Sequence, residues 1–198
     1  MTPVFCCGFE CGVSASIAVS NHHWTTQSYF SIVTSKARSG NRSGQILKTS
    51  DTAGGVFSNT ILPTSSIVVM RCYIYFDVLP NATCPVIHFP NGIPGVWFNV
   101  SDSKLYPGYT GSVLGTSGVL IAINTWYRLD IRVNSSVNPW LIDLQVNDIA
   151  CNQLSRSNAA QNQTDIVIGN STIAVTTTYY IDDIVVSNTS ADYPIGPG

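Results

Sequence analysis

Charged residues are scarce in this chain of 198 residues. Lys, Arg, Asp and Glu make up 10% of it, against about a quarter of an average globular protein. The three Lys and six Arg form no run, and the net charge is −2. Nucleic-acid binding needs clustered basic residues, so we expect no nucleic-acid partner. No apolar stretch approaches the ~20 residues of a membrane-spanning helix, so we expect no membrane partner either.

The spacings of common metal and catalytic sites are also missing. Six cysteines form no C-x-x-C pair and three histidines stand at no ligand spacing, which argues against zinc. Buried thiols are favoured over disulfides, and Cys7 with Cys11 is the first pair to consider in an oxidising compartment. Glu10 is the only glutamate and the ten aspartates are scattered. The two positioned carboxyl groups of a glycosidase are therefore not recognisable, and we expect no enzyme activity.

Helical periodicity is almost absent, and short strand patterns follow one another along the chain. Residues 66–78 are rich in β-branched and aromatic side chains. Residues 125–133 and 140–148 alternate between apolar and polar side chains on either side of a turn-forming NSSVNP segment, which predicts a hairpin. Many short strands without helices predict an all-β fold, an antiparallel two-sheet β-sandwich. Further strands are expected at residues 28–36, 45–50, 54–61, 84–89, 95–101, 119–123, 164–169 and 178–187.

Three groups of residues carry a resemblance to concanavalin A-like jelly-roll domains. FECG at residues 9–12, followed by Trp24 and by RSGNRS at residues 38–43, is similar to the opening of these domains. The hairpin at residues 126–148 resembles a laminin-G-like hairpin, and YYIDDIVV at residues 179–186 resembles the last strand of the same group. The resemblance covers both ends and the centre of the chain.

The resemblance implies a fold and leaves the function open. It predicts one concanavalin A-like jelly-roll domain over residues 1–188 and a flexible Pro/Gly-rich carboxyl-terminal tail over residues 189–198. The domains that the chain resembles include laminin-G-like domains, MAM-type domains, sugar-binding modules and jelly rolls in structural proteins of tailed bacteriophages.

Two adjacent aspartates, Asp182 and Asp183, interrupt the last strand. Neighbouring strand residues point to opposite faces, so at least one carboxylate must face inward or find a partner. The resemblance implies a structural calcium ion held by Glu10 and Asp183, with Asp182 as a further candidate ligand. Calcium prefers six to eight oxygen ligands and would offset buried carboxylates. The alternatives are that Asp183 accepts hydrogen bonds from backbone N–H groups of the amino-terminal turn, or faces water.

Aromatic residues supply the candidates for glycan contact. Sugar-binding jelly rolls stack aromatic rings on the faces of sugars. Trp97 and Trp126 stand at strand positions that could be exposed. Tyr106 and Tyr109 belong to the turn-rich segment KLYPGYTG, where we expect a solvent-facing aromatic platform. The alternative is that these two tyrosines cover an edge of the sheet.

A non-enzymatic virion structural protein of a tailed bacteriophage is the function that the resemblance favours. The domain would serve as a capsid decoration, fibre or tail component, assembled in the host cytoplasm as a homo-oligomer, with other virion subunits as partners and host glycans as a further contact. A nearly uncharged surface suits such assembly. The alternative is a secreted, extracellular carbohydrate-binding module or lectin.

Overall fold

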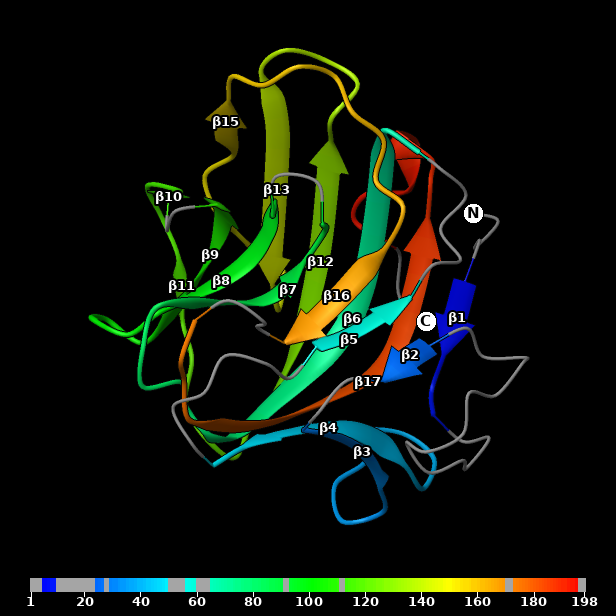
Figure 1. The fold of residues 1–198 in the computed structure, drawn as a ribbon, viewed down its shortest axis with the longest axis vertical. Coiled ribbons are helices and arrows are strands. Elements are labelled where there is room, and N and C mark those ends of the chain that lie inside the picture. The colour runs from blue at the N-terminus through cyan, green and yellow to red at the C-terminus, as the bar shows by residue number, and fades with distance from the viewer. Residues whose placement is uncertain are drawn as a thin grey trace.

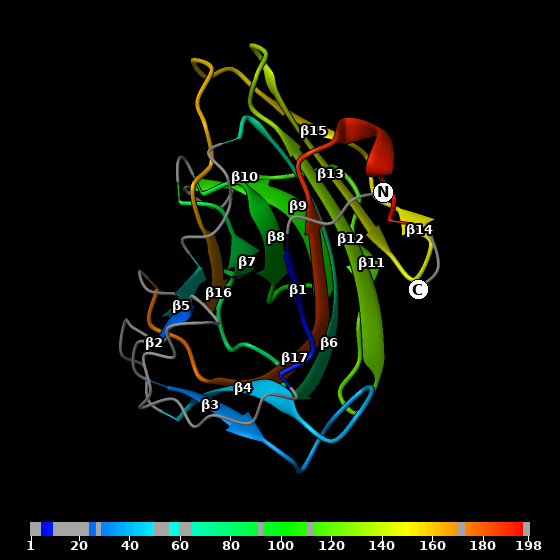
Figure 2. The same ribbon diagram turned by 90° about the vertical axis from the view of Figure 1, so that its right-hand side faces the viewer.

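A two-layer sandwich of antiparallel sheets forms the fold (Figure 1). Figure 2 shows the same two layers from the side. The predicted all-β two-sheet sandwich is therefore confirmed. The computed structural model describes residues 5–9, 24–26, 29–49, 56–59, 65–90, 93–110, 113–169 and 173–195.

Sheet A has the strand order β14-β13-β12-β6-β17-β4-β3, with β15 paired to β13 and β1 paired to β17. It contains the longest strands of the described chain, and β6 and β17 lie at its centre. Its strands are β1 (Phe5–Cys7), β3 (Phe30–Val33), β4 (Ser43–Lys48), β6 (Ile67–Val78), β12 (Trp126–Asn134), β13 (Trp140–Val146), β14 (Ile149–Ala150), β15 (Leu154–Arg156) and β17 (Thr177–Ser187).

Sheet B has the order β10-β9-β8-β7-β16-β5-β2, with β11 paired to β9. The strands of sheet B are β2 (Trp24–Thr26), β5 (Val56–Asn59), β7 (Cys84–His88), β8 (Gly95–Asn99), β9 (Lys104–Tyr109), β10 (Val113–Leu114), β11 (Val119–Leu120) and β16 (Ile166–Gly169).

No helix in the described part of the chain is long and apolar enough to cross a bilayer.

Alternation along the strands builds the core between the sheets. The predicted hairpin is confirmed, because β12 pairs antiparallel with β13 and Ile131 stands opposite Leu144. Burying one such aliphatic side chain contributes about 1.5–3 kcal/mol to stability. Seven inward-facing residues of the hairpin are buried, and they are Leu129, Ile131, Val133, Trp140, Ile142, Leu144 and Val146.

Two cysteines contribute free thiols to this core. Cys72 and Cys84 are buried and unpaired by any disulfide. Burial raises the pKa of the Cys84 thiol to about 12, so it stays protonated and chemically inert at neutral pH. The predicted buried thiols are confirmed for these two residues. The side chains of Cys7 and Cys11 lie outside the described residues.

The segment that the sequence predicts to be a loop with two exposed tyrosines is strand β9. Tyr106 and Tyr109 are both buried, so the expected solvent-facing platform is wrong. Pro107 and Gly108 suggested a turn, but a strand tolerates proline where no neighbour needs its N–H. The Pro107 carbonyl still takes part, accepting a hydrogen bond of 2.8 Å from the backbone N–H of Gly115.

Residues 190–195 pack against sheet A, although the sequence predicts a flexible tail. The 3₁₀-helix η2 (Ser190–Asp192) follows β17 directly. The Arg132 guanidinium of β12 lies 4.8 Å from the ring centroid of Tyr193, and Ile195 is buried. These contacts hold the described part of the carboxyl-terminal segment on the domain.

Candidate functional site: the outer face of sheet A

Strands β1 and β17, from the two ends of the chain, are neighbours. Phe5 stands opposite Val186 and Cys7 opposite Ile184 in the β1–β17 pairing. The first half of β17 pairs with β4 instead, as far as Ile181. The two aspartates therefore lie where the partner of β17 changes from β4 to β1.

A β-bulge in β17 contradicts the expected alternation of the two aspartates. Asp182 stands opposite Tyr73 of β6 and Val185 opposite Arg71, so β17 has one extra residue between them. Asp183 absorbs the distortion with a φ of 48°, in the left-handed region that Asp tolerates better than most residues. Because a bulge breaks the two-residue period, both carboxylates can reach the same loop, which joins β3 to β4.

Arg38 and Ser39 of this loop supply the partners of both carboxylates. Asp182 Oδ2 accepts hydrogen bonds from the backbone N–H groups of Arg38 at 2.9 Å and Ser39 at 3.4 Å. Asp183 accepts from Arg38 Nη1 at 2.9 Å and from Ser39 Oγ at 2.6 Å. Burial raises the pKa of Asp182 to about 6, against the opposing effect of its backbone N–H partners. The Arg38 guanidinium also stacks 3.7 Å above the ring of Tyr73.

The calcium site remains a prediction. Glu10, its expected first ligand, lies outside the described residues. A Cβ built on Gly8 would be 3.6 Å from Asp183 Oδ1, so the amino-terminal segment does approach the aspartate pair. In the part of the chain that the structure describes, no three His, Cys, Asp or Glu side chains gather as metal ligands. Asp182 and Asp183 fit a cation only if it shares or displaces the donors from Arg38 and Ser39.

A row of five residues crosses the same outer face, one from each of five adjacent strands. Gln45 of β4 pairs with Ser31 of β3 on one side and with Tyr180 of β17 on the other. Tyr180 pairs with Tyr75 of β6, and Tyr75 pairs with Trp126 of β12. Residues directly opposite one another share a face of the sheet, so all five side chains stand on one side.

The aromatic rings at the end of this row contact one another. The ring centroids of Tyr75 and Trp126 are 5.4 Å apart, and those of Tyr75 and Tyr180 are 5.9 Å apart in an edge-on arrangement. Both distances are typical of favourable aromatic pairs. Tyr75 and Tyr180 are buried by their neighbours, whereas Trp126 is partly exposed. Trp126 therefore offers the accessible ring of the row.

Hydrogen bonds fix the polar groups around these rings. Lys36 Nζ donates to Tyr75 Oη at 2.9 Å, and Tyr75 Oη donates to Asn124 Oδ1 at 3.1 Å. Tyr180 Oη donates to Asp77 Oδ2 at 2.8 Å. Lys36 and Asp77 are also 3.7 Å apart as a partly exposed ion pair. The network holds its members in fixed positions before any ligand arrives.

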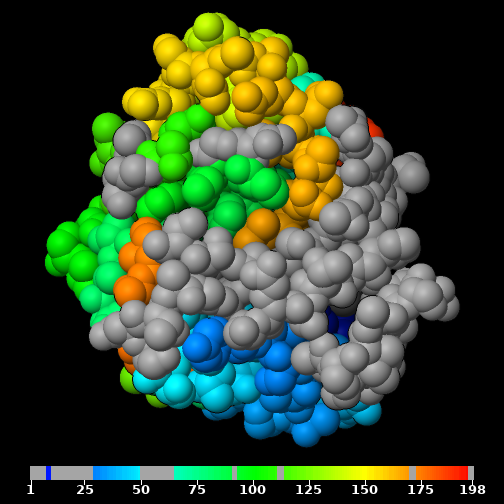
Figure 3. Space-filling model, viewed as in Figure 1, coloured from blue at the N-terminus to red at the C-terminus, as the bar shows by residue number. Residues whose placement is uncertain are grey.

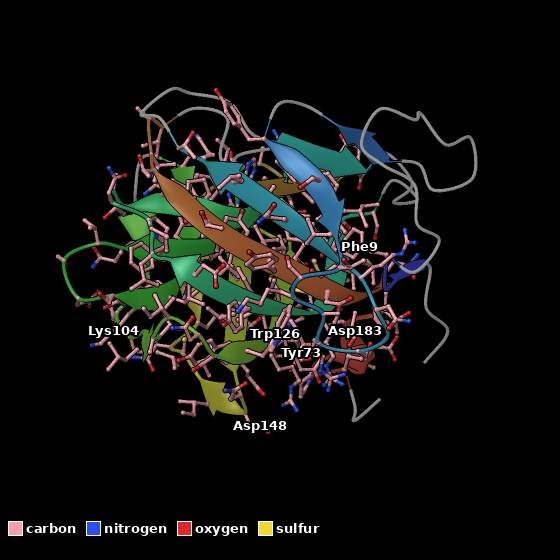
Figure 4. The ribbon with its side chains drawn as sticks, turned by 90° about the horizontal axis from the view of Figure 1, so that it is seen from below. Phe9, Tyr73, Lys104, Trp126, Asp148 and Asp183 are labelled. Carbon is pink, nitrogen blue, oxygen red and sulfur yellow. The ribbon has the colours of Figure 1, made fainter. Side chains whose placement is uncertain are left out.

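Arg128 follows Trp126 on the same face of β12 and binds two carboxylates. Its Nε lies 3.0 Å from Asp130 Oδ2, and its Nη2 forms an ion pair with the exposed Asp148. Asp130 also binds Arg71 Nε at 2.9 Å, and both members of that pair are buried. Figure 4 shows Trp126, Tyr73 and Asp183 along one side of sheet A, with Asp148 beyond them.

The other tryptophan candidate, Trp97, lies on the outer face of sheet B and is not accessible there. Trp97 of β8 is 2% exposed, so the prediction that it could be exposed is wrong. A Cβ on Gly108 of β9 would lie 2.3 Å from Trp97 Cδ1, which means that the indole lies flat on glycine backbone. Trp97 Nε1 donates to the Ile93 carbonyl at 3.4 Å. Figure 3 looks onto this side of the molecule.

Tyr75, Tyr180 and Lys36 are site residues that the sequence analysis missed. The alternation in residues 66–78 contains the signal for Tyr75, because Cys72, Ile74 and Phe76 share the opposite, inward face. Nothing in the spacing brings Lys36 to that ring, since the loop between β3 and β4 decides its position.

The sequence matches no protein-family model and no curated protein. The fold is similar to that of the cellulose induced protein Cip1, with a TM-score of 0.66 at 16% identity over 93% of this chain and 97% of that chain. It is also similar to Trypanosoma rangeli sialidase in complex with the inhibitor DANA, with a TM-score of 0.54 at 12% identity over 80% of this chain. The chain spans only 27% of that sialidase.

A third similar structure is the binding domain of botulinum neurotoxin DC in complex with rat synaptotagmin II. Its TM-score is 0.58 at 10% identity, over 84% of this chain and 43% of that one. Identities this low establish the fold alone. The similarities fit a jelly-roll β-sandwich, as the resemblance in the sequence implies.

Proposed function

We propose that this chain is a carbohydrate-binding domain that holds a glycan on the outer face of sheet A, with a sugar ring stacked on Trp126. The observation that carries the proposal is the row across five strands that ends in Trp126, the partly exposed ring among its aromatic members. Asn124 lies two residues before Trp126 and is exposed, and Arg128 lies two residues after it on the same face.

The chemistry of this face suits a sugar. The apolar C–H groups of a sugar ring pack on an aromatic face, while its hydroxyls need both donors and acceptors beside that face. Lys36 and Arg128 are donors, and Asn124, Asp77 and Asp148 bear acceptors. Because the network already fixes these side chains, binding loses less side-chain entropy.

Two similar structures add support through their names. Cip1 is named for its induction by cellulose, and the Trypanosoma rangeli protein is named a sialidase. Both names connect this fold with carbohydrates. The carbohydrate-binding alternative of the sequence analysis therefore has more support than the virion role.

Glycan binding by the Trp126→Ala variant tests the proposal. We expect binding on a glycan array and in affinity electrophoresis to weaken at least about tenfold, because removing the stacking ring costs more than about 1.4 kcal/mol. Val137→Ala is the matched control, since Val137 is exposed in the turn at the other end of β12. Unchanged binding by Trp126→Ala at an unchanged melting temperature would refute the site.

The virion role, the homo-oligomer and the absence of enzyme activity stay predictions. The absolute mass in solution, from size-exclusion chromatography with light scattering, tests the first two together. A closed oligomer such as a trimer would favour a virion component, because such particles use symmetric building blocks. A monomer would favour the extracellular carbohydrate-binding module.

A further inference from the structure

We infer that the Trp126 site takes uncharged glycans and discriminates against glycans that carry carboxylates or sulfates. The inference rests on the proposed function, since it names the substrate class of the same site. It depends on how the charges of the outer face of sheet A are distributed and paired.

Five cations on the described part of this face are already bound to carboxylates. Lys36 pairs with Asp77 at 3.7 Å and Arg38 with Asp183 at 2.9 Å. Arg71 and Arg132 pair with aspartates at 2.9 and 2.8 Å. Arg128 pairs with two aspartates at once. An anionic sugar would have to take a guanidinium or ammonium away from one of these carboxylates.

Carboxylates outnumber cations in these contacts of the face. Among the described residues that take part in them, five cations stand beside six carboxylates, so the surplus is one negative charge. The cations are Lys36, Arg38, Arg71, Arg128 and Arg132, and the carboxylates are those of Asp77, Asp130, Asp143, Asp148, Asp182 and Asp183. An approaching anion therefore meets net repulsion, which is stronger at low ionic strength.

A neutral sugar avoids both costs. A hydroxyl both donates and accepts, so one or two neighbouring hydroxyls can donate to the carboxylate and accept from the cation of the same pair. The ion pair then stays intact while the sugar binds at its edge. Two pairs beside Trp126 have an accessible edge, because the Lys36 side chain is 36% exposed and the Asp148 side chain is 75% exposed.

Polygalacturonate and its fully methyl-esterified form provide a matched pair of probes with the same sugar backbone, in which a charged carboxylate is replaced by a neutral methyl ester. Dextran and dextran sulfate provide a second pair. We expect the wild-type protein to bind the neutral member of at least one pair about tenfold more tightly in affinity electrophoresis, with a larger ratio at low salt than at physiological salt.

The double variant Asp77→Asn/Asp148→Asn removes two of the carboxylates while keeping hydrogen-bonding side chains of similar shape. We expect it to raise affinity for the charged polymers and so to narrow the ratio. Affinity for the neutral polymers should not rise, because their hydroxyls lose the two charged acceptors. Equal or tighter wild-type binding of the charged polymers, lost in Trp126→Ala, would overturn the inference and leave the proposed function standing. Failure to bind any member of either pair, or any glycan on the array, would overturn the proposed function itself.

Discussion

The outer faces of the two sheets differ in almost every property although one alternation rule builds both. Six of the seven ion pairs among the described residues lie on sheet A. Sheet B has one, between Lys104 and Asp102. Its outer side has Trp97, Val167 and His88, all buried. The few charges of the chain are therefore concentrated on sheet A, where loops and neighbouring strands supply partners of opposite charge.

His88 shows the other consequence of this distribution. It stands opposite Gly95 and Val167 in sheet B, and its Nδ1 is buried with no hydrogen-bond partner among the described residues. Burial lowers the pKa of His88 to about 4. On sheet A, by contrast, buried Asp182 has three N–H partners. Hydrogen-bond donors compensate the buried carboxylate on sheet A, whereas the buried imidazole on sheet B has no acceptor at Nδ1 among the described residues and stays neutral.

Asp130→Ala, on the outer face of sheet A, should lower the stability of the protein most. The substitution leaves the buried guanidinium of Arg71 and that of Arg128 without their shared carboxylate, which we expect to cost about 3–5 kcal/mol of unfolding free energy. The matched variant on sheet B, Lys104→Ala, removes a partly exposed pair and should cost less than about 1 kcal/mol. Urea denaturation of both variants measures the difference, and similar losses would show that the two faces do not differ in this way.

Chelation tests whether a calcium ion compensates the carboxylates of Asp182 and Asp183 at the β17 bulge. If Glu10 and Asp183 hold calcium, excess chelator should lower the melting temperature, by the equivalent of about 2.7 kcal/mol when free calcium is a hundredfold above its dissociation constant. An unchanged melt, on protein shown by elemental analysis to have lost its metal, would leave Arg38 and Ser39 as the compensation for these carboxylates.

Gly108→Ala tests the packing on the outer face of sheet B. The new Cβ would collide with the indole of Trp97, so we expect a loss of about 1–3 kcal/mol from overpacking. Glycan binding per folded molecule should stay unchanged, because Trp126 is on the other sheet. Thermal melts and affinity electrophoresis measure the two effects, and a loss of binding without a loss of stability would place the glycan on sheet B.

The pH dependence of stability should have opposite signs on the two faces. Folded Asp182 keeps its proton up to about pH 6 and the unfolded chain only to about pH 4, so its contribution falls as pH rises through that interval. Folded His88 loses its proton near pH 4 and the unfolded chain near pH 6.5, so its contribution rises over the same interval. Each effect is on the order of 1 kcal/mol per unit of pKa displacement.

Two variants separate these opposing contributions. In urea denaturation at several pH values between 4 and 7, the stability of His88→Gln relative to wild type should fall as pH rises. That of Asp182→Asn relative to wild type should rise. If the stabilities of both variants, relative to wild type, changed in the same direction with pH, the opposite pKa shifts assigned to Asp182 and His88 would be contradicted.

The strand pattern was predictable because backbone pleating makes it a local property. The alternation of residues 125–133 placed Leu129 and Ile131 inward and Trp126 outward, and the structure agrees. Strand β9 escaped prediction because Pro107 and Gly108 are turn residues in isolation. Only the pairing with β8, and the packing of Trp97 on Gly108, makes an extended conformation favourable there.

By itself the sequence determined the fold class, the hairpin of β12 and β13, and the burial of the Cys72 and Cys84 thiols. These follow from side-chain period, turn chemistry and hydrophobicity along a short stretch of chain. Only the tertiary structure decided which aromatic ring is accessible and how the charges pair. Those properties depend on register across five strands, on one bulge at Asp183, and on a loop that brings Lys36 and Arg38 over β6 and β17. Contacts between residues far apart in the chain leave no period in the sequence.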